Sequence, residues 1–244
     1  MDKVGEKIEE SKINSALNGA NTTVRIRTVN TTETYRGRCQ DGACAYDYAM
    51  RFERGPRRGI DAREQKAVRK IFSQLRDCRS LLDVPSGAGR FLRNLAGEKR
   101  AVIEMDSALE MLQFAMDRAV KAGIESSFIQ GDASRLPLPN ASVDGVFSNR
   151  LLHHITSAGE RAIFLREFHR VSRRYLVVSF FDYRAFGKLR IFLKRLKGRK
   201  VNYNGQPTLE EFRTEVTSAG FRVRSFVPTG GPWVSQKYFV LEKV

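Results

Sequence analysis

Three aspartates each come at the end of a short apolar run, which is where a parallel sheet gathers the residues that bind a ligand. Asp83 follows "SLL", Asp106 follows "AVIEM" and Asp132 follows "SSFIQG". In open α/β sheets ligands bind beyond the carboxyl ends of the strands, and an acid after the second strand accepts both hydroxyls of a ribose. Asp132 is placed to accept a hydrogen bond from an adenine amino group, while the N–H of Ala133 donates to the ring. The three acids therefore predict a nucleoside site.

Two glycines, Gly87 and Gly89, follow the first of these runs in "DVPSGAGRF". Glycine allows the backbone to approach a ligand where a Cβ would collide, and the helix behind it points free N–H groups at the pocket. A dinucleotide fingerprint needs a third glycine, and Leu92 stands at that position. The loop thus favours a ligand without a pyrophosphate, with a purely structural turn as the alternative.

Strand-like and helix-like runs alternate between residues 60 and 220, which predicts an α/β fold. The class is doubly wound, with a mostly parallel seven-stranded sheet and an antiparallel last strand, because only a turn-rich loop separates the final two runs. The expected strands are 80–84, 100–105, 126–130, 141–148, 174–181, 221–227 and 236–243.

Capping signals define several of the expected helices. A helix begins near Ile60, a second has Ser107 as its N-cap and ends at Gly123, and the last begins with the capping box of Thr208 and Glu211. Residues 1–44 are polar and without clear periodicity, so we expect a mobile arm with one short strand inside 22–29, followed by one domain over 45–244.

The segments "LLDVPSGAGRF", "VIEMDSALEML" and "GDASRLPLPNASVDGVFSNRLLHHI" resemble the class I S-adenosylmethionine-dependent methyltransferases, in particular the type 11 group. The resemblance covers about residues 60–244 and implies a Rossmann-like fold and S-adenosyl-L-methionine as cofactor. It implies that Asp83 engages the methionine moiety and that Asp106 and the adjoining Ser107 hold the ribose.

The resemblance also places the glycine loop along the cofactor and Asp132 with Ala133 at the adenine. Pro85 departs from the family pattern, since a glycine is usual there. Proline fixes φ and lacks an N–H donor, so one backbone contact is lost, although we expect the cofactor still to bind beside Pro85.

Acceptor chemistry is expected at the end of the fourth strand, in "FSNRLLHHI". Of two adjacent histidines, His154 is the candidate base, with a buried or capping histidine as the alternative, and Asn149 is a candidate for orienting the acceptor. By the resemblance, the segment before the first helix folds over the cofactor, so Tyr46 and Arg51 are expected to bind substrate; a packed N-terminal helix is the alternative. No metal is required.

The chain is strongly basic, with a formal net charge of +16 and a pI of about 10.2 over 244 residues. This favours anionic partners. Much of the charge lies in a basic amphipathic insertion at about 184–205, where Lys188, Arg190 and Lys194 share one helical face. We expect them to bind an anionic small molecule or an amphiphile such as a phosphorylated glycolipid, or to lie solvated on the surface.

Two other functions stay open, an RNA methyltransferase and a binding module that keeps the fold without turnover. The absence of a zinc-finger or RNP pattern disfavours nucleic acid. The first 20 residues lack the apolar run of a signal peptide and no run is long enough to span a membrane. We therefore expect a cytoplasmic protein, with peripheral contact at the inner membrane surface as a further expectation.

Overall fold

The computed structural model describes residues 8–9, 26–28, 52, 57–97, 100–182, 196, 206–231 and 234–244. Predictions at Tyr46, Arg51, Lys188, Arg190 and Lys194 lie outside the described residues. So does the predicted insertion at 184–205 except for Leu196, which is helical and 68% exposed.

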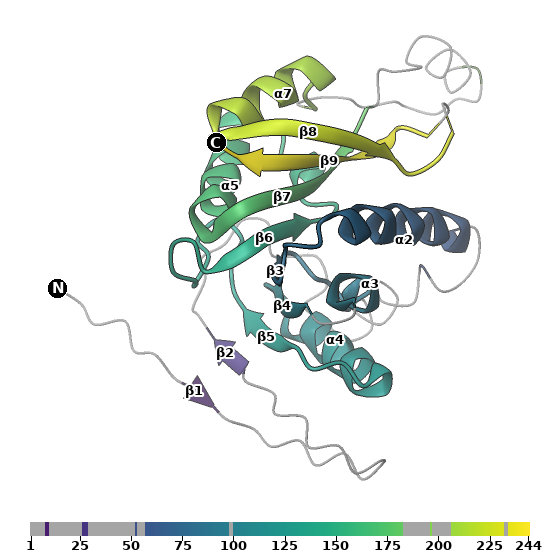
Figure 1. The fold of residues 1–244 in the computed structure, drawn as a ribbon, viewed down its shortest axis with the longest axis vertical. Coiled ribbons are helices and arrows are strands. Elements are labelled where there is room, and N and C mark those ends of the chain that lie inside the picture. Colours follow the sequence, from purple (N-terminus) through teal and green to yellow (C-terminus); the bar gives the residue numbers. More distant parts are fainter. Residues whose placement is uncertain are drawn as a thin grey trace, which may run out of the picture.

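A single twisted sheet forms the centre of the molecule, with the strand order β1-β2-β5-β4-β3-β6-β7-β9-β8 (Figure 1). The pairs among β5, β4, β3, β6 and β7 are parallel, whereas β9 runs antiparallel to both β7 and β8. This confirms the predicted seven-stranded sheet with its antiparallel last strand. Its strands are β3 (Ser80–Asp83), β4 (Ala101–Asp106), β5 (Ser127–Gln130), β6 (Val143–Ser148), β7 (Ser172–Phe181), β8 (Phe221–Pro228) and β9 (Gln236–Lys243).

Two further strands extend the sheet beyond the seven that we expected. β2 (Ile26–Thr28) pairs in parallel with β5, and β1 (Ile8–Glu9) pairs antiparallel with β2. β2 confirms the short strand expected within residues 22–29. The added strands satisfy backbone groups along the β5 edge, which would otherwise be unpaired. The other residues of the predicted arm lie outside the described residues.

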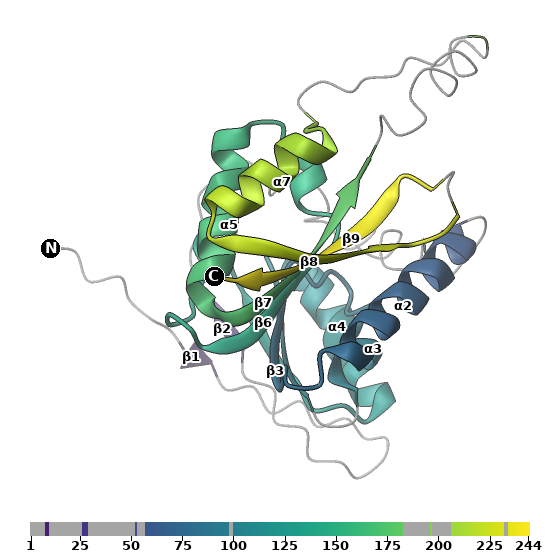
Figure 2. The same cartoon turned by 45° about the horizontal axis from the view of Figure 1, so that its top comes forward.

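Helices cover both faces of the sheet (Figure 2). On one face lie α2 (Arg57–Gln74), α3 (Leu92–Ala96) and α4 (Leu109–Ala122), which pack on Leu81, Val102 and Phe128. On the other lie α5 (Ala158–Val171) and α7 (Leu209–Ser218). Within the described ranges, no helix is long and apolar enough to cross a membrane.

The capping predictions are confirmed in two cases and wrong in one. Gly123 ends α4 in the left-handed conformation, and Thr208 and Glu211 form the expected capping box of α7. Ser107, however, is not the N-cap of α4, because that position belongs to Ala108, whose N–H donates to Asp106 Oδ1 at 3.0 Å. The Asp106 carboxylate thus takes the donor at this turn. α2 begins at Arg57, three residues before the expected Ile60.

Candidate cofactor and acceptor site

The glycine loop connects β3 to α3 and depends on left-handed backbone at both glycines. Gly87 has φ +56° and Gly89 has φ +66°. A Cβ on Gly89 would lie 2.9 Å from Cα and Cβ of Ala115 in α4, so this glycine is needed for close packing of the loop on the helix. A Cβ on Gly87 would meet no atom within 4 Å, so its backbone borders open space. The loop thus has a packed side and an open side.

Asp106 lies directly beneath the open side of the loop. Its Oδ2 accepts the Gly87 N–H at 2.8 Å and its Oδ1 accepts the Ala108 N–H at 3.0 Å. Burial raises the pKa of this carboxyl, while the N–H groups of Ala108, Gly87 and Ser107 lower it by favouring the ionised form. Both oxygens keep a second lone pair, so the carboxylate retains acceptor capacity for hydroxyl groups.

Asp83 and Glu104 form a second acidic cluster deeper under the loop. They are cross-strand partners in the β3–β4 pairing, and their side chains are 1% and 0% exposed. No described group makes a hydrogen bond of normal geometry to any of their carboxyl oxygens. Burial, then Glu104 and Asp106, raises the pKa of Asp83 well above its usual range, while Arg90 lowers it. Burial likewise raises the pKa of Glu104 to about 8, against the neighbouring Ser86 hydroxyl, which lowers it.

The remaining predicted cofactor residues line the same edge of the sheet. Asp132 follows β5 and is half-buried, with its Oδ1 accepting the Ser134 N–H at 2.9 Å. Ala133 packs against the core on the face of the sheet that α5 and α7 cover. Ser107 is exposed, and its carbonyl accepts a hydrogen bond from the Gln130 side chain. The structure therefore brings the three strand-end acids together as expected, although no described contact tests what each binds.

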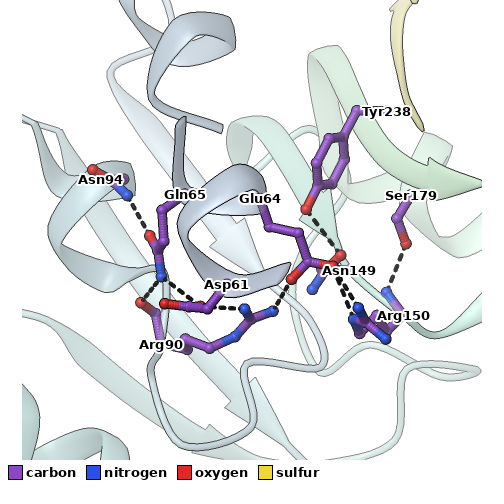
Figure 3. A network of polar contacts seen from close by, with 9 residues as sticks. All are labelled: Asp61, Glu64, Gln65, Arg90, Asn94, Asn149, Arg150, Ser179 and Tyr238. Atoms are coloured by element: carbon purple, nitrogen blue, oxygen red, sulfur yellow. Dashed lines mark hydrogen bonds and ion pairs between the residues drawn. The ribbon is translucent and has the colours of Figure 1, made fainter. Parts of the chain in front are cut away.

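Glu64 is a fully buried carboxylate of α2, and two loops, the glycine loop and the segment after β6, contact it (Figure 3). Glu64 Oε2 accepts from Arg90 of the glycine loop at 2.6 Å, and its Oε1 accepts from Arg150 Nη2 at 2.6 Å and Nε at 3.0 Å. Arg90 also pairs with Asp61. The Arg90 and Arg150 guanidinium groups lie 4.1 and 5.2 Å from the centre of the Phe52 ring. One carboxylate therefore ties the cofactor loop to the segment after β6.

Asn149 and Arg150 begin that segment and are held from behind. The Tyr238 hydroxyl donates to Asn149 Oδ1 at 3.0 Å, and the backbone N–H of Arg150, which has φ +60°, donates to Ser179 Oγ at 2.7 Å. Asn149 is 9% exposed, whereas the Arg150 side chain is 21% exposed. Asn149 is thus fixed by Tyr238, while Arg150 keeps partial access to solvent.

A small pocket opens next to Arg150, at the carboxyl ends of β6 and β7. It is lined by Leu152, His153, Arg161, Ser179, Phe180, Phe181, Gln206, Pro207 and Phe212. Phe181 links the pocket to Arg150, whose guanidinium lies 5.3 Å from the ring centre. The pocket is mainly apolar, and Arg150 supplies a cation at its border.

The two histidines differ in environment. His153 lines the pocket, with its ring 4.5 Å from Phe181 and 3.8 Å from His154. Its Nδ1 is buried without a described hydrogen-bond partner, and burial, aided by His154 and Arg150, lowers its pKa to about 3. His154, the predicted base, is exposed and is not among the lining residues. The catalytic roles of His154 and Asn149 stay predictions, but the pocket itself is formed with His153.

Comparison with known proteins supports the reading of this edge as a methyltransferase site. Residues 82–176 match the family model described as a methyltransferase domain. A malonyl-[acyl-carrier protein] O-methyltransferase of Yersinia pestis is 32% identical over 100 residues, 41% of this chain and 35% of the relative. The biotin biosynthesis bifunctional protein BioHC of Cellvibrio japonicus is 39% identical over 72 residues, 30% of this chain and 14% of the relative.

The alignments with these curated relatives thus span little more than a third of their length at most. Among solved structures, magnesium protoporphyrin IX methyltransferase from Synechocystis PCC 6803 with bound SAH has a TM-score of 0.67 at 16% identity, over 83% of this chain and 94% of that one. At this identity the likeness establishes the fold, which includes the strand order and the antiparallel β9.

The site fits S-adenosylmethionine by its own residues. Asp106 retains acceptor positions for ribose hydroxyls, and Gly87 leaves open space where a side chain would stand. Asp83 offers two buried carboxyl oxygens that no described group has satisfied.

Sequence reasoning missed Glu64, Arg90, Glu104 and Arg150. For Glu104 a signal existed, because an acid between the apolar residues of "AVIEM" must be buried in a strand and so needs a partner or a proton. The others become visible only in the folded chain.

Proposed function

Because the chain is a member of the class I S-adenosylmethionine-dependent methyltransferases, we propose that it transfers a methyl group from S-adenosylmethionine to a carboxylate oxygen of an anionic, partly apolar acceptor. The observation that carries the carboxylate is the pocket beside Arg150, which combines a cation, an apolar lining and no effective base among its described residues.

The cofactor supplies an activated methyl group on a sulfonium, so the protein must bind, orient and exclude water. We assign the ribose to Asp106, the methionine moiety to the cluster at Asp83, and the adenine to the turn at Asp132 and Ala133. Gly87 gives the backbone its close approach. Glu64 keeps Arg90 and Arg150 in fixed positions, so the cofactor loop and the acceptor segment share one rigid support.

A carboxylate acceptor suits the protonation chemistry of the pocket. A hydroxyl acceptor needs a base with a pKa near the working pH, whereas the pKa of His153 is lowered to about 3 and this ring is a weak base. A carboxylate is already anionic and needs no proton removed. Arginine is suited to hold it, because the planar guanidinium presents several donors in one plane. Two Arg150 nitrogens donate to Glu64, and no described residue accepts from its Nη1.

The curated relatives support an acceptor of this kind. The Yersinia pestis relative is an O-methyltransferase of a malonyl group on acyl-carrier protein, and a malonyl thioester ends in a carboxylate. This favours a carboxylate over the phosphorylated glycolipid that we had expected from charge alone. Phe181, which is half-buried at the border of the pocket, would contact the apolar part of such a molecule.

The test is transfer of labelled methyl groups to malonyl thioesters and to fractionated cell extract. A methyl ester releases its label as volatile methanol in mild alkali, whereas ethers and methylated amines do not. We expect alkali-labile label, and we expect Arg150→Gln to raise the acceptor KM far more than it changes S-adenosylhomocysteine binding. Arg174→Gln, a variant at an arginine with a half-exposed side chain, is the matched control.

Other products would overturn the carboxylate assignment. Alkali-stable label in the RNA fraction would indicate an RNA methyltransferase. Tight binding of S-adenosylhomocysteine with no label in any fraction would indicate a binding module without turnover. If the folded protein binds neither form of the cofactor, the methyltransferase assignment itself fails.

We also propose that the basic segment at 184–205 attracts the anionic acceptor or an anionic surface. Leu196, its one described residue, is helical and 68% exposed, so this apolar side chain is accessible to solvent. Each basic residue near an anionic membrane contributes about 1 kcal/mol, screened within a Debye length. Changing Lys188, Arg190, Lys194 and Arg195 together to Gln should weaken acceptor or vesicle binding at low salt and leave cofactor binding unchanged. If the quadruple variant and the wild type bind acceptor and vesicles with equal affinity at every salt concentration, this proposal is wrong.

A further inference from the structure

Glu104 is a buried acid to which the proposed function assigns no role of its own. It lies two residues before Asp106 on β4 and is the cross-strand partner of Asp83 on β3. Alternate residues of a strand share a face, and paired residues of adjacent strands do so as well. The side chains of Asp83, Glu104 and Asp106 therefore lie on the same face of the sheet, under the glycine loop.

This cluster is short of positive charge. The charged or polar groups that influence it are Asp106 from β4, Arg90 and the Ser86 hydroxyl from the glycine loop, and the neutral Tyr238 hydroxyl from β9. Arg90 is the one cation among them, and Glu64 and Asp61 already pair with it. Two carboxylates that are taken out of water without a partner carry a large desolvation penalty.

Two remedies exist for such a pair, a bound proton or a bound cation. Two buried carboxyl groups on paired residues of adjacent strands cannot both ionise easily, so one proton is retained and the two groups titrate as a unit. The methionine end of S-adenosylmethionine carries two positive charges, on its ammonium and sulfonium groups, and one negative charge on its carboxylate. A ligand cation beside Asp83 would replace the retained proton.

We propose that Asp83 and Glu104 form a proton-exchanging pair beneath the glycine loop, which holds a proton in the free protein and releases it when a cationic methionine moiety binds. Glu104 is a positioning residue in this scheme, since it sets the charge of Asp83 from beneath. The proton leaves to solvent and no covalent bond of the cofactor changes. The inference rests on the cofactor site proposed above, and it adds that binding is linked to pH.

Calorimetry in two buffers of different ionisation enthalpy counts the protons released on binding. For the wild-type protein at pH 7 we expect release approaching one proton per S-adenosylmethionine bound, falling toward zero above pH 8, where the pKa of Glu104 lies. Below pH 8, the dissociation constant should fall by up to about tenfold for each unit by which the pH is raised. Glu104→Gln keeps the side-chain shape and should reduce both the release and this pH dependence, since burial alone still raises the pKa of Asp83. Glu242→Gln, at an acid on β9 that is 7% exposed and pairs with Arg174 and Arg222, is the control outside the cluster and should keep both.

Three ligands identify the cation without any variant, so the test stands even if Glu104→Gln does not fold. Release with S-adenosylmethionine and S-adenosylhomocysteine, and none with methylthioadenosine, assigns the ammonium. Release with S-adenosylmethionine alone assigns the sulfonium. Equal release with all three ligands, no release by the wild type, or full release by Glu104→Gln would overturn the pair. Binding without proton release leaves the cofactor site intact, whereas an absence of binding defeats the proposed function itself.

Discussion

Replacing Glu64 by glutamine should destabilise the protein strongly, although no part of the cofactor is assigned to this residue. Glu64 is fully buried and accepts three charge-assisted hydrogen bonds from Arg90 and Arg150. Removing one partner of a buried ion pair costs about 3–5 kcal/mol because the other charge is left uncompensated. The two arginine side chains are 13% and 21% exposed, which partly solvates them. We therefore expect a loss near the lower end, about 3 kcal/mol.

Urea denaturation followed by circular dichroism measures this loss directly. In a domain of this size about 1 kcal/mol shifts the melting temperature by roughly 2–4 °C, so Tm should fall by roughly 6–12 °C. Asp77→Asn is the control, because Asp77 pairs with Arg174 where both side chains are 51% exposed, and such pairs contribute about 0–1 kcal/mol. If Glu64→Gln loses no more than Asp77→Asn, the network at Glu64 does not support the fold as reasoned here.

Three other perturbations test separate parts of the site. Asp106→Ala should weaken S-adenosylhomocysteine binding by about 1–3 kcal/mol in calorimetry, the cost of losing hydrogen bonds to a charged group; unchanged affinity would remove Asp106 from the ribose site. Gly89→Ala should cost more stability than Gly87→Ala, since both occupy left-handed backbone but only Gly89 places a Cβ 2.9 Å from Ala115; equal melting temperatures would contradict this. The pKa of His153 is about 3 in the folded chain, below its unfolded value near 6.5, so between these pH values the unfolded chain binds one more proton. The stability of the wild type should therefore fall as the pH drops from about 6.5 towards 3. His153→Phe should lose less stability over that range, which thermal melts at several pH values would measure.

Local patterns were sufficient for the strands and helices along the chain and for the acids at the strand ends. An apolar run of four to six residues buries as a strand, and alternation with helices makes the sheet parallel. Asp83, Asp106 and Asp132 follow the carboxyl ends of parallel strands, so they lie at the same edge of the sheet whatever the length of the connections between them. The capping box at Thr208 is equally local, since it needs only residues three apart. Ser107 misled because a capping rule reads one residue, whereas in the folded chain α4 begins one residue later, with Ala108 at the N-cap position.

The sequence by itself therefore determined the fold class and the edge of the sheet where the cofactor is expected, because these follow from periodicity and short-range spacing. Its motifs also carried the resemblance to the methyltransferases. The tertiary structure alone decided which charges meet. Glu64 joins Arg90 and Arg150 across 26 and 86 residues of chain, and the pairing of Glu104 with Asp83 depends on the register between two strands. It also decided that His153, and not its neighbour, lines the pocket. Such pairings are set by packing between distant elements, and the desolvation that alters the pKa values of these groups exists only once those elements have closed over them.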